Sequence, residues 1–362
     1  MTKPPFRADQ VGSLLRPADL ADARAKFKRK EISSSALHEI EDRRIEEAVR
    51  KQEAIGLESI TDGEMRRDWW HLDFMLQLDG VTATANPGPK FGGTEEQPPI
   101  PSVTGKVGCS KPIMVGDFSF LKTTTKKTAK FTIPSPSMLH LRGGRASISK
   151  EVYPDIDAFW ADVAAAYRKA IRNFADAGCT YLQLDDVSFS YLCDPRIQDN
   201  CRKNGDDPAR LPGTYAKAVS EALRDRPEGM TVTMHTCRGN FKSSWVASGG
   251  YEPVAEAMFA SGPDAFFMEF DSERAGTFEP LRFLPKGKRI VLGLVTTKTG
   301  SLEEKDTIRR RIEAASRYVP LENLCLSPQC GFASTHHGNA LSLEEQWRKL
   351  ERVVEVAREV WK

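Results

Sequence analysis

Short apolar runs alternate along the chain with longer stretches in which apolar residues recur every three or four positions. The longer stretches predict amphipathic helices, because this spacing places the apolar side chains on one helical face. The region 155–177 shows the pattern most clearly, and Gly178 follows it as a stop signal. Similar spacing predicts helices over 35–55, 208–224, 303–318 and 343–361.

The short apolar runs predict eight strands, each followed by polar or turn-forming residues. They cover 9–15, 59–64, 130–135, 181–186, 230–237, 265–271, 289–295 and 324–330. Strands that alternate with helices favour a parallel sheet, and eight such units predict a (β/α)8 TIM barrel that spans 1–362 as a single domain. The main alternative is an open doubly wound sheet, but we find no glycine-rich phosphate loop after a strand, which disfavours its nucleotide-binding form.

One region interrupts this alternation. Residues 84–112, after the second predicted strand, are rich in proline and glycine. The region is too long for a plain connecting loop, so we expect a hairpin or a lid inserted into the barrel. The alternative is that these prolines and glycines only punctuate a loop.

Composition narrows the classes of function. The 362 residues carry 52 Lys and Arg against 50 Asp and Glu, with no long charged block. This balance disfavours nucleic acid or an anionic membrane surface as a partner. No apolar run approaches the roughly 18 residues that span a bilayer, and the first residues lack the pattern of a signal peptide, so we expect a cytoplasmic protein. Seven cysteines, an odd number, disfavour a disulfide framework.

Metal-binding residue types gather where the predicted strands end, which is where TIM barrels carry their active sites. His235 and Cys237 are two residues apart, so they point to the same side of a strand. Alone, such a pair is more often a half-buried cysteine beside an incidental histidine. Glu269 and Cys330 follow at the ends of later strands. One histidine, one carboxylate and two thiols suit a tetrahedral zinc ion, so we expect Zn²⁺ as the cofactor.

The motifs that contain these residues, MHTC, FFMEF and LSPQCG, resemble the catalytic barrel of cobalamin-independent methionine synthase. VGSLLRP, TDGE and LQLDD follow the order of the same family, so the resemblance covers nearly the whole chain. It implies zinc bound by His235, Cys237, Glu269 and Cys330. It also implies transfer of a methyl group to a thiol, that of homocysteine, from a methylfolate or methylcobamide donor.

The resemblance also implies an amino-acid pocket. Ser13 corresponds to a residue that holds the substrate carboxylate, and Glu64 and Asp185 correspond to residues that bind its amine. The structural alternative is that either acid caps a helix or pairs with a nearby arginine.

The chain departs from the family pattern in two ways. It has room for only one barrel and so resembles the short, single-barrel branch. The loop after the seventh predicted strand, GLVTTKTGSLE, lacks the histidine acid of the family and offers only Lys298 or Thr297 as partial substitutes. His336 and His337, just past Cys330, are further candidates for the acid, although a structural role is common for such residues.

Trp69 and Trp70 follow Glu64 closely and can stack on a flat donor ring such as a pterin, unless they belong to the core. Two other functions remain open: zinc-dependent alkyl transfer to a different thiol, and a non-catalytic barrel with a structural zinc. The sequence leaves the oligomeric state open.

Overall fold

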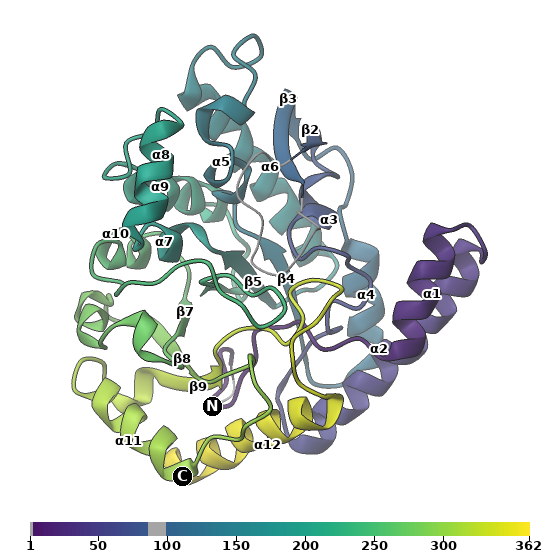
Figure 1. Ribbon diagram of the computed structural model, residues 1–362, viewed down its shortest axis with the longest axis vertical. Helices are drawn as coiled ribbons and strands as arrows, with labels where there is room; N and C mark the ends of the chain where they lie inside the picture. The colour runs from purple at the N-terminus through teal and green to yellow at the C-terminus, as the bar shows by residue number, and fades with distance from the viewer. Residues whose placement is uncertain (1–2, 86–98) are drawn as a thin grey trace.

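A computed structural model describes residues 3–85 and 99–362. Seven parallel strands form one sheet, which curls around a central axis with the longer helices on its outside (Figure 1). In sheet order the strands are β1 (Ser59–Ile60), β4 (Thr128–Pro134), β5 (Tyr181–Asp186), β6 (Thr231–Thr236), β7 (Ala265–Glu269), β8 (Arg289–Val295) and β9 (Leu324–Pro328). The predicted α/β fold with a parallel sheet is confirmed.

The five helices predicted from periodicity are present, with ends that differ by a few residues. They are α2 (Ser34–Ile55), α6 (Ile156–Asp176), α9 (Leu211–Leu223), α11 (Lys305–Ser316) and α12 (Leu343–Val360). The remaining α-helices are α1 (Ala18–Lys28), α3 (Leu72–Met75), α4 (Val115–Thr124), α5 (Met138–Leu141), α7 (Ser188–Tyr191), α8 (Pro195–Lys203) and α10 (Ala255–Phe259). Short 3-10 helices are η1 (Gly144–Ser147), η2 (Glu273–Ala275), η3 (Glu279–Phe283) and η4 (Leu321–Asn323).

Helix α6 shows how sequence pattern and packing agree. The side chain of Asp155 caps its first turn by accepting a hydrogen bond from the Asp157 amide. Phe159, Val163 and Tyr167 lie on one face and are fully buried. Their spacing of four residues places them one above another, so a single face packs against the body of the protein.

The strand predicted over 9–15 is not a regular strand. Ala8 forms one isolated parallel bridge with Leu326 of β9, and the Leu14 amide donates to the Gly63 carbonyl at 3.0 Å. Gly12 between them has a φ of +149°, in the range that favours glycine, which interrupts a regular ladder. The segment therefore runs extended between β9 and the loop that follows β1, with few ladder hydrogen bonds.

A buried ion pair fixes this segment to the sheet. Lys130 of β4 lies 3.3 Å from the Asp9 carboxylate, and both side chains are fully buried. Asp9 also accepts hydrogen bonds from Ser59 at 2.8 Å and from the Tyr181 hydroxyl at 2.9 Å. The N-terminal segment is thus bonded to β1, β4 and β5 from the inner side of the sheet.

Lys130→Met is expected to destabilise the protein by about 3–5 kcal/mol, because it leaves the Asp9 carboxylate buried without its cation. Urea unfolding followed by circular dichroism measures the change. Lys127→Met is the matched control, since Lys127 pairs with Glu58 on the surface at 2.7 Å and its loss should cost less than about 1 kcal/mol. Equal effects in the two variants would contradict the role of the buried pair.

An antiparallel hairpin stands apart from the main sheet. It consists of β2 (Asp79–Thr84) and β3 (Ile100–Gly108), paired from Asp79↔Gly108 to Thr84↔Ile100. It coincides with part of the insertion expected over 84–112, of which residues 86–98 lie outside the described part of the chain. The lid role of this insertion and the single-domain boundary remain predictions.

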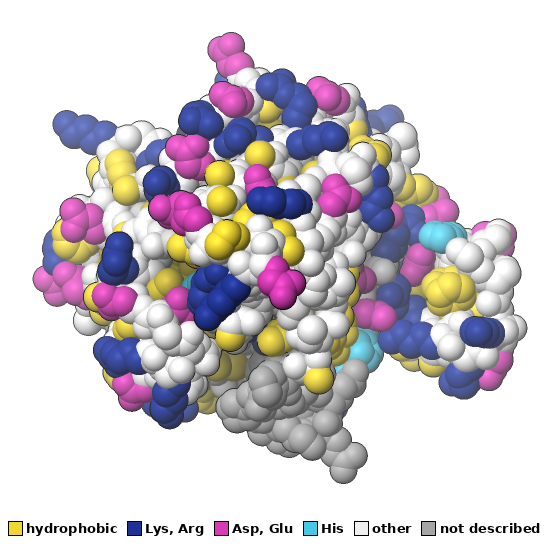
Figure 2. All heavy atoms as spheres, turned by 90° about the horizontal axis from the view of Figure 1, so that it is seen from above, with side chains coloured by type: hydrophobic (Ala, Val, Ile, Leu, Met, Phe, Trp, Pro, Cys, Tyr) yellow, Lys and Arg dark blue, Asp and Glu magenta, His cyan; other side chains and the backbone are white. Residues whose placement is uncertain are grey.

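Two further observations concern the surface charge and membrane-spanning helices. On the face shown in Figure 2, basic and acidic side chains are interspersed, without a large area of one sign. Over residues 3–85 and 99–362, no helix is both long enough and apolar enough to cross a membrane.

Candidate metal centre

Four potential metal ligands from three strand ends meet in one place. His235 lies in β6, Cys237 directly follows it, Glu269 ends β7, and Cys330 follows β9. Their ligand atoms lie within 4.8 Å of one another, and all four side chains are buried. The sulfur atoms of Cys237 and Cys330 are 3.5 Å apart. The structure therefore brings together the set that the sequence predicts as a metal site.

The backbone around Cys237 is built to hold this arrangement. The Cys237 amide donates to the Asp186 carbonyl of β5 at 2.8 Å. The Gly239 amide points back at the Cys237 sulfur at 3.3 Å, and the Arg238 amide donates to Glu269 at 3.1 Å. Gly239 has a φ of +93°, which a residue with a side chain rarely adopts, so this turn favours glycine. Amides aimed at a sulfur and a carboxylate stabilise both as anions.

Asp185 orients the imidazole of His235. Its carboxylate lies 3.4 Å from Nδ1 and is itself held by Gln183 at 2.7 Å. The other ring nitrogen, Nε2, lies 3.3 Å from the carbonyl oxygen of Gln329. Burial disfavours the charged ring, but Asp185 and Cys330 outweigh it and raise the pKa of His235 to about 10. The surroundings of the ring therefore favour a positive charge at this point.

Two of the remaining three groups, Cys330 and Glu269, supply negative charge. The hydrogen-bonding contact with the Cys237 sulfur and the positive charge of His235 outweigh burial and hold the pKa of Cys330 well below its usual value. The same contact and burial hold the pKa of Cys237 well above its usual value, so the two thiols share one proton. Burial opposes ionisation of Glu269, yet Lys298 and Arg274 keep its pKa below the ordinary value. An imidazole with these anionic groups is a donor set suited to a divalent cation.

Asp185→Asn is expected to weaken zinc binding about 10- to 100-fold, because it removes the carboxylate that fixes the His235 ring. Competition with a chromophoric chelator measures the affinity. Asp206→Asn is a matched control, since Asp206 lies at the same distance, 3.4 Å, from His140, which is not one of the four ligands. Unchanged zinc affinity in the Asp185 variant would contradict the positioning role.

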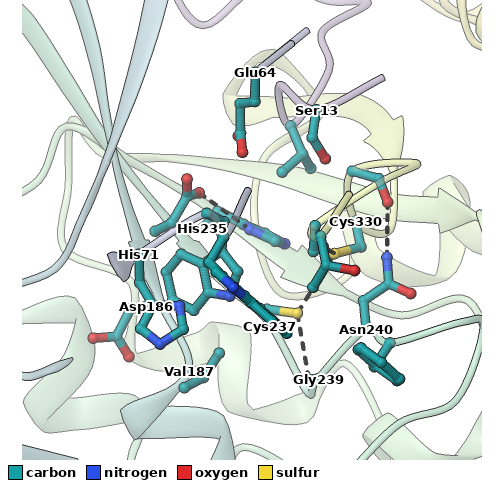
Figure 3. Close-up of a pocket in the computed structure, with 18 of the residues that line it drawn as sticks. Ser13, Glu64, His71, Asp186, Val187, His235, Cys237, Gly239, Asn240 and Cys330 are labelled. Carbon is teal, nitrogen blue, oxygen red and sulfur yellow. Dashed lines mark hydrogen bonds and ion pairs between the residues drawn. The ribbon is translucent and has the colours of Figure 1, made fainter. Parts of the chain in front are cut away.

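A pocket opens onto this centre (Figure 3). His235, Cys237 and Cys330 form part of its wall, and the space inside, including the part open to solvent, is about 640 Å³. The predicted substrate residues Ser13, Glu64 and Asp185 and the predicted stacking residues Trp69 and Trp70 also line the pocket.

Glu64 and Ser13 lie at the same end of the pocket (Figure 3). Glu64 accepts a hydrogen bond from Thr132 on one carboxylate oxygen at 3.1 Å, while its other oxygen has no hydrogen-bond partner and lies 3.7 Å from Arg67. Burial, with a contribution from Asp185, raises the pKa of Glu64 to about 7. The second carboxylate oxygen makes an ion pair with Arg67 but no hydrogen bond within the described residues, so it can also accept one from a cationic group such as an ammonium.

Ser13 packs closely against Gly331, the residue that follows Cys330. Its hydroxyl accepts a hydrogen bond from the Ala333 amide at 3.3 Å. A Cβ atom on Gly331 would stand 1.9 Å from the Ser13 oxygen, so only glycine permits this approach. The hydroxyl is thereby placed on the pocket wall beside Cys330.

The polar groups considered as acids fall outside this wall. His336 and His337 contact each other, with ring centres 3.9 Å apart, and pack against Trp69 and Phe241 rather than lining the pocket. Lys298 is buried, with Nζ 3.3 Å from the Gly239 carbonyl, and holds the turn after Cys237. Neither it nor Thr297 lines the pocket.

The pocket wall also contains the nitrogen-bearing side chains of His71 and Arg142, of which sequence reasoning missed Arg142. His71 follows Trp70 directly, in the loop that carries Glu64, and the sequence offers it as a further candidate histidine. Arg142 follows the short helix α5, whose path the residue pattern does not reveal.

Comparison with known proteins decides the family. The family described as cobalamin-independent synthase, catalytic domain, matches residues 6–359. This chain belongs to that family. The uncharacterized protein YxjH of Bacillus subtilis is 47% identical over 99% of this chain and 96% of its own length.

Solved structures of the family show the same architecture. A putative vitamin-B12 independent methionine synthase from Listeria monocytogenes superposes with a TM-score of 0.82 at 41% identity and covers 100% of both chains. A B12-independent methionine synthase from Shewanella sp. W3-18-1, solved in complex with selenomethionine, has a TM-score of 0.72 at 19% identity, covering 98% of this chain and 97% of its own. The second likeness is one of fold.

Proposed function

We propose that this member of the family is a zinc-dependent methyltransferase that moves a methyl group to the thiol of homocysteine, giving methionine. The donor is a methylfolate or a methylcobamide. One observation carries the proposal: the ligand atoms of His235, Cys237, Glu269 and Cys330 lie within 4.8 Å of one another beside a pocket that also contains Glu64. Family membership supplies the reaction class.

Zinc, when bound, supplies the means to hold the acceptor sulfur as a thiolate at neutral pH, where a free thiol with a pKa of about 8.5 is mostly protonated. Catalytic zinc sites usually keep three protein ligands, and this chain offers four. Glu269 has alternative partners, because Arg274 donates to it at 2.9 Å and the Arg238 amide at 3.1 Å. It is therefore the ligand that can yield its position to the substrate.

The pocket residues orient the acceptor. The second carboxylate oxygen of Glu64 and the carboxylate of Asp185 face an ammonium group, and the Ser13 hydroxyl takes the carboxylate end. Trp69 and Trp70 offer aromatic rings at the pocket wall for a flat donor. With its ammonium and carboxylate groups bound in this way, an amino-acid substrate has its sulfur next to the two cysteines.

We also propose that the N-terminal segment completes a (β/α)8 barrel. The Ala8 bridge to β9 and the hydrogen bond from Leu14 to the loop after β1 support this closure, because they join the two edge strands through one segment. A closed barrel leaves no exposed sheet edge.

Metal analysis and X-ray absorption at the zinc edge test the function. We expect one zinc per chain and an additional sulfur neighbour when homocysteine is added. Cysteine and 2-mercaptoethanol serve as comparison thiols, and a preference for one of them would favour alkyl transfer to a different acceptor. Absence of zinc, or a zinc environment that no thiol changes, would overturn the proposal, and the latter result would indicate a structural metal.

A further inference from the structure

His71 is an unusual pocket residue, because it is 1% exposed and neither ring nitrogen has a hydrogen-bond partner within residues 3–85 and 99–362. An unsatisfied polar group in the interior costs about 1–3 kcal/mol, so such groups are rare in native proteins and call for a bound partner or another explanation. Burial and the nearby Arg142 hold the pKa of His71 well below its ordinary value. The ring is therefore neutral at physiological pH and offers the pocket an N–H donor as well as an acceptor.

Arg142 lines the same pocket. Its Nε atom is buried without a hydrogen bond, and among residues 3–85 and 99–362 no hydrogen bond or ion pair reaches its guanidinium group. Arg67, another cationic residue nearby, differs because its guanidinium donates to Thr132. A guanidinium is always charged and binds carboxylates or phosphates through paired N–H groups, so an unpaired one at a pocket wall is ready for an anion.

The surroundings do not supply that anion. Asp186, drawn beside His71 in Figure 3, accepts hydrogen bonds from Ser188 at 2.7 Å and from the Phe189 amide at 3.1 Å. Its carboxylate is thus already used within the protein. Glu64 and Ser13 lie at the other end of the pocket, across His235 and Cys237 in the same view.

We propose that Arg142 and His71 form an anion subsite for the second small molecule that enters the pocket. Arg142 contributes the charge and His71 an N–H donor, and the group bound is a carboxylate or a phosphate. Assigning this molecule as the methyl donor rests on the proposed function. The binding of an anion at these two residues does not, since it depends on charge and hydrogen bonding alone.

Calorimetric titration of the zinc-loaded protein with inorganic phosphate and, separately, with succinate tests the subsite. We expect saturable binding of at least one of them, and a histidine NMR signal, assigned to His71 with a His71→Gln variant, that shifts along the same titration. Arg142→Gln should weaken binding about tenfold or more, as expected for a lost charge-assisted hydrogen bond. Which of the two anions binds distinguishes a phosphate-bearing from a carboxylate-bearing ligand.

Two further variants make the result decisive. Lys242→Gln removes an exposed cation next to Phe241 of the pocket wall and should leave the affinity within about twofold of the original. Arg142→Lys keeps the charge but not the paired N–H groups, so it should bind more tightly than Arg142→Gln and less tightly than the original, which separates loss of charge from misfolding. Failure of both anions to bind, or equal affinity in Arg142→Gln, would overturn the subsite. Failure of the methyltransferase proposal would instead appear at the zinc edge, with anion binding intact.

Discussion

Cys237→Ser is expected to lose zinc and to lower kcat/KM for methyl transfer by about a thousandfold or more. A metal binds cysteine as the thiolate, whereas a serine hydroxyl stays protonated, so the site loses one of its two sulfur ligands. A metal contributes several kcal/mol to such reactions, and each 1.36 kcal/mol is about tenfold in rate. Zinc content by mass spectrometry and initial rates with homocysteine measure the two effects.

Cys109→Ser is the control for this substitution. Cys109 is also buried, but its thiol donates to the Lys111 carbonyl just beyond the β2–β3 hairpin and is not one of the four ligands. Zinc content and turnover should therefore remain unchanged in that variant. Stoichiometric zinc with normal turnover in Cys237→Ser would show that the ligand assignment is wrong.

Glu64→Gln is expected to raise KM for homocysteine about 10- to 100-fold, because the amide cannot provide the negative charge that the ammonium group requires. The pH dependence has a definite sign. The pKa of Glu64 is raised to about 7, so the carboxylate is charged above that pH and neutral below it. In the unsubstituted protein, KM should therefore rise as the pH falls through 7, and in Glu64→Gln this part of the profile should disappear.

Measurements of KM between pH 5.5 and 8 with a fixed donor concentration distinguish this effect from general damage. Glu58→Gln is a suitable comparison, since Glu58 pairs with Lys127 on the surface and does not line the pocket. A Glu64→Gln profile that keeps its rise below pH 7 would assign the titration to another group.

The sequence predicts the metal set better than any other part of the site. Parallel strands bring their carboxyl ends to one edge of a sheet, so His235, Glu269 and Cys330 meet although they are far apart in the chain. This prediction requires only the positions of the strands along the chain, and short apolar runs indicate those positions well. The long helices were predictable for a similar reason, because a three- to four-residue period extends over many turns.

Where the chain leaves regular structure, the prediction weakens. The segment at 9–15 reads as a strand, but Gly12 and the buried Asp9 give it a different set of hydrogen bonds. His336 and His337 lie close in sequence to Cys330, yet the turn directs them toward Trp69 and Phe241. In a loop, closeness in sequence does not determine where a side chain points, because no helical or strand periodicity constrains it.

The contact between Ser13 and the loop after β9 determines how late in translation the pocket can form. The Ala333 amide reaches the Ser13 hydroxyl across 320 positions of sequence, and Gly331 packs against the same side chain. Ser13 therefore cannot reach its position on the pocket wall until the residues up to Ala333 have been translated. A product truncated before Cys330 lacks one of the four proposed metal ligands and the loop that packs on Ser13.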